Sequence, residues 1–383
     1  MDQATIDFSP ELQDEAALQT PDRVGFEIGW DHARHRLTPP PEHLLAGHPV
    51  REGWAAGAAV FGARTLRPRP SVRQWLQLRL QAWMRGTAFE DVQVTPNWLA
   101  QIDVAVCPVT GEPLTHGKGG PTDATVVRVN RDAGCAAGNL AVSSGRAGAA
   151  LARCDWRAAT EMAQQIEAGG PERVDGLDAA QWSRLAVLVS FATPLPHAAA
   201  AALPLLLLPP PRLRVLNPAQ ALQVLVTLRL VRAGQPARLD ELARLFPEEM
   251  RSTFCVFATT LLARSIGAGP RADDAALRRA MEDAWVQPLV LQRWQRLALR
   301  LSAAQCEHIV HAAVERGLAG TALRCLSPTQ ATEGWALASG GQLPRIASNG
   351  TATEASPRRA ARRTAAVVTL ARTAPRPGGR LHG

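Results

Sequence analysis

Three side chains that could carry acid–base or metal chemistry lie within one glycine-rich stretch of the chain, namely His116, Asp123 and Asp132. An imidazole can act as a general base or as a metal ligand, and carboxylates provide the oxygen ligands that magnesium prefers. Such a site forms only if loops bring the imidazole and a carboxylate to the same point. These residues are therefore the candidate catalytic residues, and their use depends on the elements that position them.

The residues around these side chains follow an ordered pattern, CPVTGEPLTHG and then TDATVVRVNRDAGCAAGNLAVSS. The pattern, over residues 107–150, resembles the HNH group of His-Me finger nucleases. Members of that group read Cys-Pro-x-Thr-Gly, then Leu-Asp-Arg-Val-Asn, then Gly-Tyr-x-x-Gly-Asn-Leu. The matching positions are Cys107, Pro108, Thr110, Gly111, Arg128, Val129, Asn130, Gly134, Gly138, Asn139 and Leu140.

The resemblance implies a small module of two strands and a helix. In the nucleases, such a module holds a divalent metal, magnesium or manganese, which neutralises charge on the phosphate while a base activates water. On this pattern residues 126–129 and 140–142 form the strands, and the helix begins near Ser143 or Ser144, since serine is a favoured N-cap residue.

Five matching residues form the structural frame of the expected module. Gly134 and Gly138 shape the loop between the strands, because glycine adopts backbone conformations closed to other residues. Asn139 is expected to fix this loop through side-chain hydrogen bonds to the backbone. Asn130 ends the first strand, and Cys107 is expected to be a small buried residue because no second cysteine lies at ligand spacing.

Three departures from the pattern bear on catalysis. Val127 stands where the resemblance implies an aspartate ligand, Cys135 replaces the loop tyrosine, and Gly148 stands where an asparagine or histidine is usual. A valine side chain has no atom that can ligate magnesium. We therefore expect a module that does not cleave nucleic acid. The alternative is a metal-dependent endonuclease in which His116 works with one of the two candidate aspartates.

A second resemblance lies near the N-terminus, over residues 25–60. A GxxxGW segment at Gly25 is followed by a proline-containing loop and then by VREGWAAG, which begins at Val50. This arrangement is similar to ribosome modulation factor, a small bacterial ribosome-binding protein, and it implies association with the ribosome. An ordinary helical hairpin, in which small residues let two helices approach closely, is the alternative.

The remainder of the chain is predicted to be helical. Apolar residues recur at helical spacing between proline breaks, and Ser302 with Gln305 predicts a capping box. The fold class is therefore mainly α, with a multi-helix domain, a small ββα module and a disordered C-terminal tail. The predicted divisions are 1–62 for a helical hairpin with a loose leader, 63–150 for a helix and the ββα module, 151–338 for the helical domain, and 339–383 for the basic tail.

Positive charge is concentrated at the C-terminus. Of the formal net charge of +8, residues 341–383 carry +7, because eight arginines face one glutamate there. Such a segment adds affinity for nucleic acid by releasing counterions, and an inert solvated extension is the alternative. The candidate nucleic-acid-binding residues are Arg128 and Arg131 in the module and Arg358, Arg359, Arg362 and Arg363 in the tail.

Cysteine spacing and apolar stretches indicate whether the chain is a secreted, zinc-binding or membrane protein. The six cysteines include no CxxC pair, which favours neither a disulfide framework nor a zinc ribbon. The first residues lack the pattern of a signal peptide, and the most apolar stretch, residues 198–208, is shorter than the roughly 20 residues that cross a bilayer. We therefore expect a cytoplasmic protein without a membrane partner.

Together these observations predict a non-catalytic accessory protein that associates with DNA, RNA or the ribosome. Two alternatives remain open. One is the endonuclease, which would use magnesium or manganese. The other is a helical scaffold that binds a protein partner, in which the HNH-like segment is only a structural relic.

Overall fold

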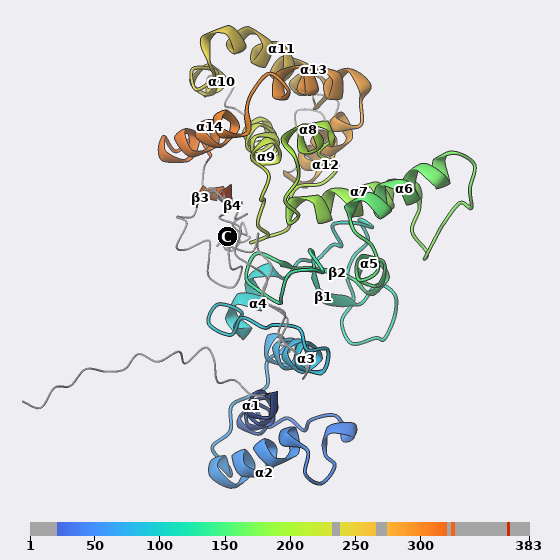
Figure 1. Cartoon of the computed structure of the whole chain (residues 1–383), viewed down its shortest axis with the longest axis vertical. Coiled ribbons are helices and arrows are strands. Elements are labelled where there is room, and N and C mark those ends of the chain that lie inside the picture. The colour runs from blue at the N-terminus through green and yellow to red at the C-terminus, as the bar shows by residue number, and fades with distance from the viewer. Residues whose placement is uncertain (1–20, 232–237, 266–273, 320–322, 326–365, 368–383) are drawn as a thin grey trace, which may run out of the picture. The chain divides into compact units, whose positions relative to one another are not determined.

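A computed structural model of the chain describes residues 21–231, 238–265, 274–319, 323–325 and 366–367. The described part is mainly helical, with fourteen α-helices and two small sheets of two strands each (Figure 1). The chain divides into two compact units, Met1–Thr87 and Ala88–Gly383, each of which has its own packing. None of the described helices is long and apolar enough to cross a membrane.

The first unit is built from short helices. They are α1 (Pro21–Arg34), the 3-10 helix η2 (Pro41–His43), α2 (Pro49–Phe61) and α3 (Pro70–Met84). Proline is the first residue of each, a position where its missing N–H costs no helical hydrogen bond. Ile28, Val50 and Leu80, one from each α-helix, form the centre of the packing.

Glycine allows α1 and α2 to touch through their backbones. A Cβ added to Gly29 would lie 1.9 Å from the carbonyl oxygen of Val50, and one added to Gly53 would lie 1.8 Å from that of Phe26. Any side chain at either position would force the helices apart. Helices α1 and α2 therefore form a closely packed pair, and the resemblance of this segment to ribosome modulation factor stays a prediction.

The second unit begins with α4 and the ββα module and continues as a helical array. Its first elements are α4 (Pro96–Ile102), β1 (Ala124–Arg128), β2 (Leu140–Ser144), α5 (Gly145–Leu151), α6 (Trp156–Glu167), α7 (Ala179–Phe191) and α8 (His197–Ala202). Its remaining elements are α9 (Pro218–Val231), α10 (Arg238–Ala243), α11 (Glu248–Ser265), α12 (Asp274–Trp285), α13 (Pro288–Ala298), α14 (Ala303–Glu315), β3 (Arg324–Cys325) and β4 (Ala366–Val367).

Helix α9 lies at the centre of the array, where α8, α12 and α14 pack around it. An aromatic cluster of Phe257, Trp285 and Trp294 fills the space between α11, α12 and α13, with ring centroids 5.4 to 5.6 Å apart. The buried indole of Trp285 donates to the hydroxyl of Thr227 on α9 at 3.0 Å. This bond satisfies the polar atom of a side chain that is otherwise packed in the core.

The divisions observed in the structure differ from those predicted at residues 62 and 150. Helix α3 packs against α1, so it belongs with the hairpin and not with the ββα module. One hydrophobic core runs from Cys107 to Leu323, and α5 packs on α7, so the ββα module and the helical array share a core. Of the predicted tail at 339–383, only Ala366–Val367 is described; it pairs with β3, and the rest lies outside the described residues.

Candidate nucleic-acid interface

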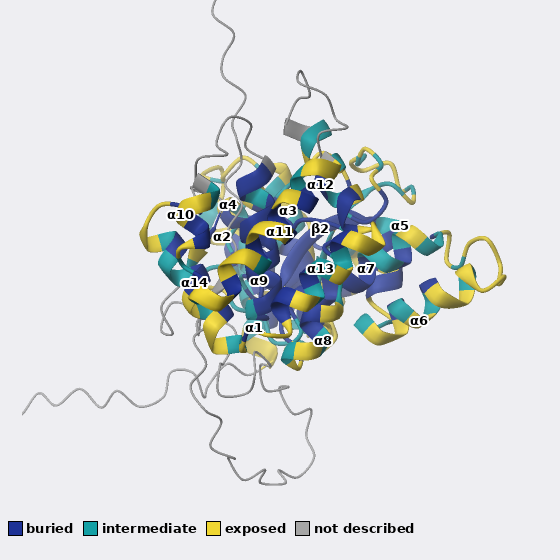
Figure 2. Cartoon of the chain, turned by 90° about the horizontal axis from the view of Figure 1, so that it is seen from above, coloured by how far each residue is buried: buried dark blue, intermediate teal, exposed yellow. Residues whose placement is uncertain are grey.

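The segment that resembles the HNH group folds as two strands and a helix. Strands β1 and β2 lie side by side (Figure 1). They are antiparallel, and Val127 lies opposite Ala141 in their register. Every residue of β2 is buried, as Figure 2 shows in dark blue. Ser144 caps α5, and its hydroxyl accepts a hydrogen bond from the amide of Ala147 at 3.4 Å. The predicted strands and helix start are confirmed to within two residues.

The loop between the strands is held by Asn139, as predicted. Its side-chain oxygen accepts from the amide of Asn130 at 2.7 Å, and its side-chain nitrogen donates to the carbonyls of Asn130 and Gly134, each at 2.9 Å. Asn139 is fully buried, so these bonds satisfy a side chain that has no access to water. Gly138 beside it has φ +90°, a conformation that favours glycine.

Cys107 joins the CPVTG turn to the junction of β2 and α5. Its buried sulfur lies 3.4 Å from the hydroxyls of both Ser143 and Ser144, and it accepts from the amides of Thr110 at 3.5 Å and Ser144 at 3.4 Å. Burial raises the pKa of this thiol, but the hydrogen bonds of Ser143, Ser144 and Thr110 outweigh burial and leave the pKa below its ordinary value. The residue is buried, as predicted, and acts as a structural link.

The structure places the two candidate aspartates on either side of β1, and it places His116 directly after Thr115, which bridges to Asp123. Asp123 precedes β1 and Asp132 follows it, and a five-residue strand rises about 13 Å from its first to its last Cα. His116 is exposed in the loop that precedes Asp123. Among the described residues, no group of three or more histidine, cysteine, aspartate or glutamate side chains could hold a metal ion. The alternative in which His116 works with one of the two aspartates stays a prediction.

Asp123 has a structural role in the glycine-rich loop. Its carboxylate accepts hydrogen bonds from the hydroxyl of Thr115 and, at 2.6 Å, from the amide of Gly119. The Thr115 hydroxyl and the loop amides of Gly119, Lys118 and Gly120 lower the pKa of Asp123. Both oxygens of the carboxylate are thus used in fixing the loop conformation.

The position at which the resemblance implies a metal is filled by an apolar contact. Val127 on β1 packs against the hydrophobic core, and a Cβ added to Gly148 on α5 would lie 2.9 Å from Cγ1 of Val127. Magnesium and manganese need oxygen or nitrogen ligands, and neither Val127 nor Gly148 has a side-chain atom of that kind. These residues therefore do not fit the metal that the HNH group uses.

The two predicted nucleic-acid-binding arginines of the module contact its own loops. Arg128 donates from Nη1 to the carbonyls of Arg131 at 2.9 Å and Ala133 at 3.0 Å. Arg131 donates from Nη1 to the carbonyl of Arg153 at 2.8 Å, and it remains exposed. Arg128 thus braces the loop, whereas Arg131 presents charge at the surface. The four candidate arginines of the tail lie outside the described residues.

A cavity of about 380 Å³ lies beside this loop and was not anticipated from the sequence. Asp132 and Arg131 from the loop line one part of it, and Asp155, Trp156 and Arg157 at the start of α6 line another. The adjacent Trp-Arg pair was visible in the sequence. Its position next to the loop depends on how α6 packs, and this packing cannot be predicted from the neighbouring residues in the sequence.

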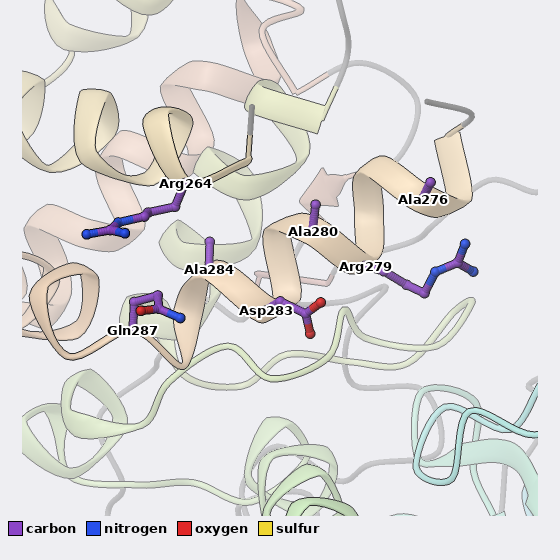
Figure 3. Close-up of a pocket in the computed structure, with 7 residues that line it drawn as sticks. All are labelled: Arg264, Ala276, Arg279, Ala280, Asp283, Ala284 and Gln287. Carbon is purple, nitrogen blue, oxygen red and sulfur yellow. The ribbon is translucent and has the colours of Figure 1, made fainter. Parts of the chain in front are cut away.

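A second cavity, of about 510 Å³, lies between α11 and α12. Figure 3 shows that the side chains of Arg264 and Arg279 extend in opposite directions, and that Asp283 points away from Arg264. Because its charged groups do not converge on one point, this cavity has no arrangement suited to a charged ligand.

No family model matches the chain, and searches among curated proteins and among solved structures give no match. What this chain does must therefore be argued from its own residues and their geometry.

Proposed function

We propose that this chain is a non-catalytic accessory protein that associates with nucleic acid, either free or within the ribosome. The observation that carries the proposal is the contact between Val127 and Gly148. Strand and helix meet there through apolar atoms, at the place where the resemblance implies metal ligands, while the loop held by Asn139 retains the frame of the module.

Association with nucleic acid is supported by charge and by the resemblance of the module. Arg131 is exposed beside the loop, and the arginine-rich segment at 358–363 adds positive charge that releases counterions from phosphate. The cytoplasm is the proposed location, since all six cysteines are free thiols, as a reducing compartment would keep them.

Gel retention with labelled DNA and RNA tests the proposal, with single strands and duplexes incubated with and without magnesium or manganese. We expect retained complexes, weakened by salt, and intact nucleic acid in every lane. His116→Ala should behave as the unsubstituted protein does. Arg173→Gln, which removes an exposed charge away from the loop, serves as the matched control.

Two results would contradict the proposal in different ways. Metal-dependent cleavage that is lost in His116→Ala would establish the endonuclease. Absence of retention for every nucleic acid would favour the protein scaffold, and the helical array of the second unit would then be the surface to test against protein partners.

A further inference from the structure

The cavity beside the loop of the ββα module combines an aromatic wall with charges of both signs. The guanidinium carbon of Arg157 lies 5.4 Å from the ring centroid of Trp156, within the range of a cation–π contact. Val189 and Pro194 add apolar lining. A cavity of about 380 Å³ is large enough for one planar ring system with its attached groups.

The aromatic wall is held in place by the start of α6. The carboxylate of Asp155 caps this helix by accepting from the amide of Ala158 at 2.8 Å, and the hydroxyl of Thr160 donates to the carbonyl of Trp156 at 2.8 Å. The indole is half-buried and packs against the hydrophobic core. Trp156 therefore presents a fixed surface, so little side-chain freedom is lost when a ligand stacks there.

Charged groups of both signs line the cavity, and Nε of Arg131 lies 4.0 Å from Oδ1 of Asp132. Arg131 is held by its bond to the carbonyl of Arg153, and the amide of Asp132 donates to the side chain of Asn130 at 3.0 Å. Arginine binds phosphate oxygens, whereas the carboxylates of Asp132 and Asp155 accept from amino and imino groups. A nucleotide carries both kinds of group, because its planar base has amino and imino groups and its sugar carries a phosphate.

The thiol of Cys154, which also lines the cavity, favours a role in ligand binding and not in catalysis. Burial raises the pKa of the Cys154 thiol to about 11, so this thiol stays protonated near neutral pH. The thiolate, not the thiol, is the nucleophilic form. Cys154 therefore contributes polarisable surface to the lining.

We propose that this cavity binds one base of a single-stranded nucleic acid, stacked against the Trp156–Arg157 wall with its phosphate near Arg131. The inference rests on the proposed function and specifies the form of nucleic acid. A base within a duplex is stacked on its neighbours, so only an unpaired base can enter the cavity.

Fluorescence anisotropy with the full-length protein and a labelled single-stranded 12-mer, as RNA and as DNA, tests the inference. Trp156→Leu keeps an apolar side chain but removes the ring, and we expect affinity for the single strand to fall about tenfold or more. Trp156→Phe retains a ring and should restore most of the affinity. Arg157→Gln should weaken binding roughly two- to fivefold, and Arg173→Gln, an exposed arginine outside the cavity, should leave it unchanged.

The outcomes separate this inference from the proposed function. Unchanged single-strand affinity in both Trp156→Leu and Arg157→Gln, with normal binding by the unsubstituted protein, would overturn the cavity as the site and leave nucleic-acid association intact. Failure of the unsubstituted protein to bind any nucleic acid would overturn both. Arg157 is exposed, so Arg157→Gln remains informative if a thermal melt shows that Trp156→Leu is unfolded.

Discussion

Val127 on β1 and Gly148 on α5 contact each other so closely that a Cβ on the glycine would lie 2.9 Å from Cγ1 of the valine. Real Cβ atoms are essentially never found so close to a neighbouring atom. The valine therefore uses the space that a side chain at position 148 would need, and the two residues are expected to be energetically dependent on one another. Both stand where the HNH resemblance implies polar or charged residues.

This dependence can be measured as a coupling free energy. Gly148→Ala should be about 1 kcal/mol better tolerated in a Val127→Ala background than in the unsubstituted protein, because the smaller side chain removes the clash. Helix propensity favours alanine equally in both backgrounds, so it cancels in the cycle. Urea unfolding of the four proteins gives the coupling. Ala149→Ser, on the exposed face of the same helix, should be additive with Val127→Ala; a coupling near zero for Gly148 would contradict the contact.

Loss of Asn139 should release the loop between the strands. Asn139→Ala removes a fully buried side chain that makes three hydrogen bonds, and we expect a loss of about 2 to 4 kcal/mol in the free energy of unfolding. Asn139→Asp should be similarly damaging, because an acceptor would then face the carbonyls of Asn130 and Gly134. Urea unfolding measures both changes. Asn97→Ala, at an exposed position of α4, is the control. If Asn139→Ala lowers the free energy of unfolding no more than Asn97→Ala does, the loop bonds are not needed.

Features decided by neighbouring residues were predictable from the sequence. Ser302 and Gln305 form the predicted capping box, because each bond joins residues three apart. Asn139 holds the loop as expected, since the residue type and the adjacent Gly138 favour this geometry. Such features are fixed within a dozen residues, so packing elsewhere in the chain changes them little.

Features that depend on distant contacts were not predictable. Asp123 and Asp132 are close in sequence, but the extended strand β1 lies between them, so they stand at opposite ends of that strand. The cavity at Trp156 exists because α6 packs beside a loop more than twenty residues earlier. Charge, periodicity and turn residues in the sequence indicate the local backbone conformation. The position of a loop relative to a distant helix is instead set by packing in the shared core.

Acidification should destabilise the first unit through His32. Burial lowers the pKa of this buried imidazole below its ordinary value of 6.5, while its Nδ1 atom donates to the carbonyl of Ile28 at 2.8 Å. Below about pH 6.5 the unfolded chain takes up a proton that the folded unit resists, so the free energy of unfolding falls as the pH falls. Hydrogen exchange in α1 should therefore be faster at pH 5.5 than at pH 7.5 after correction for the intrinsic rate. In His32→Gln this pH dependence should be reduced, and an unchanged dependence would assign the effect to other groups.

The salt dependence of binding should report the contribution of the arginine-rich tail. Substituting Arg358, Arg359, Arg362 and Arg363 by glutamine removes four positive charges, and if each contacts a phosphate the slope of log K against log salt should become shallower by about 3.6 for duplex DNA. Affinity should fall most at low salt, where counterion release contributes most.

The matched control replaces the same number of exposed arginines on the folded part of the second unit, namely Arg173, Arg279, Arg300 and Arg316. Binding titrations between 50 and 200 mM salt, a range over which slopes of this size are resolved, measure both variants. A slope that changes as much in the control as in the tail variant would show that the charge acts without regard to position, and an unchanged slope in both would exclude the tail from the interface.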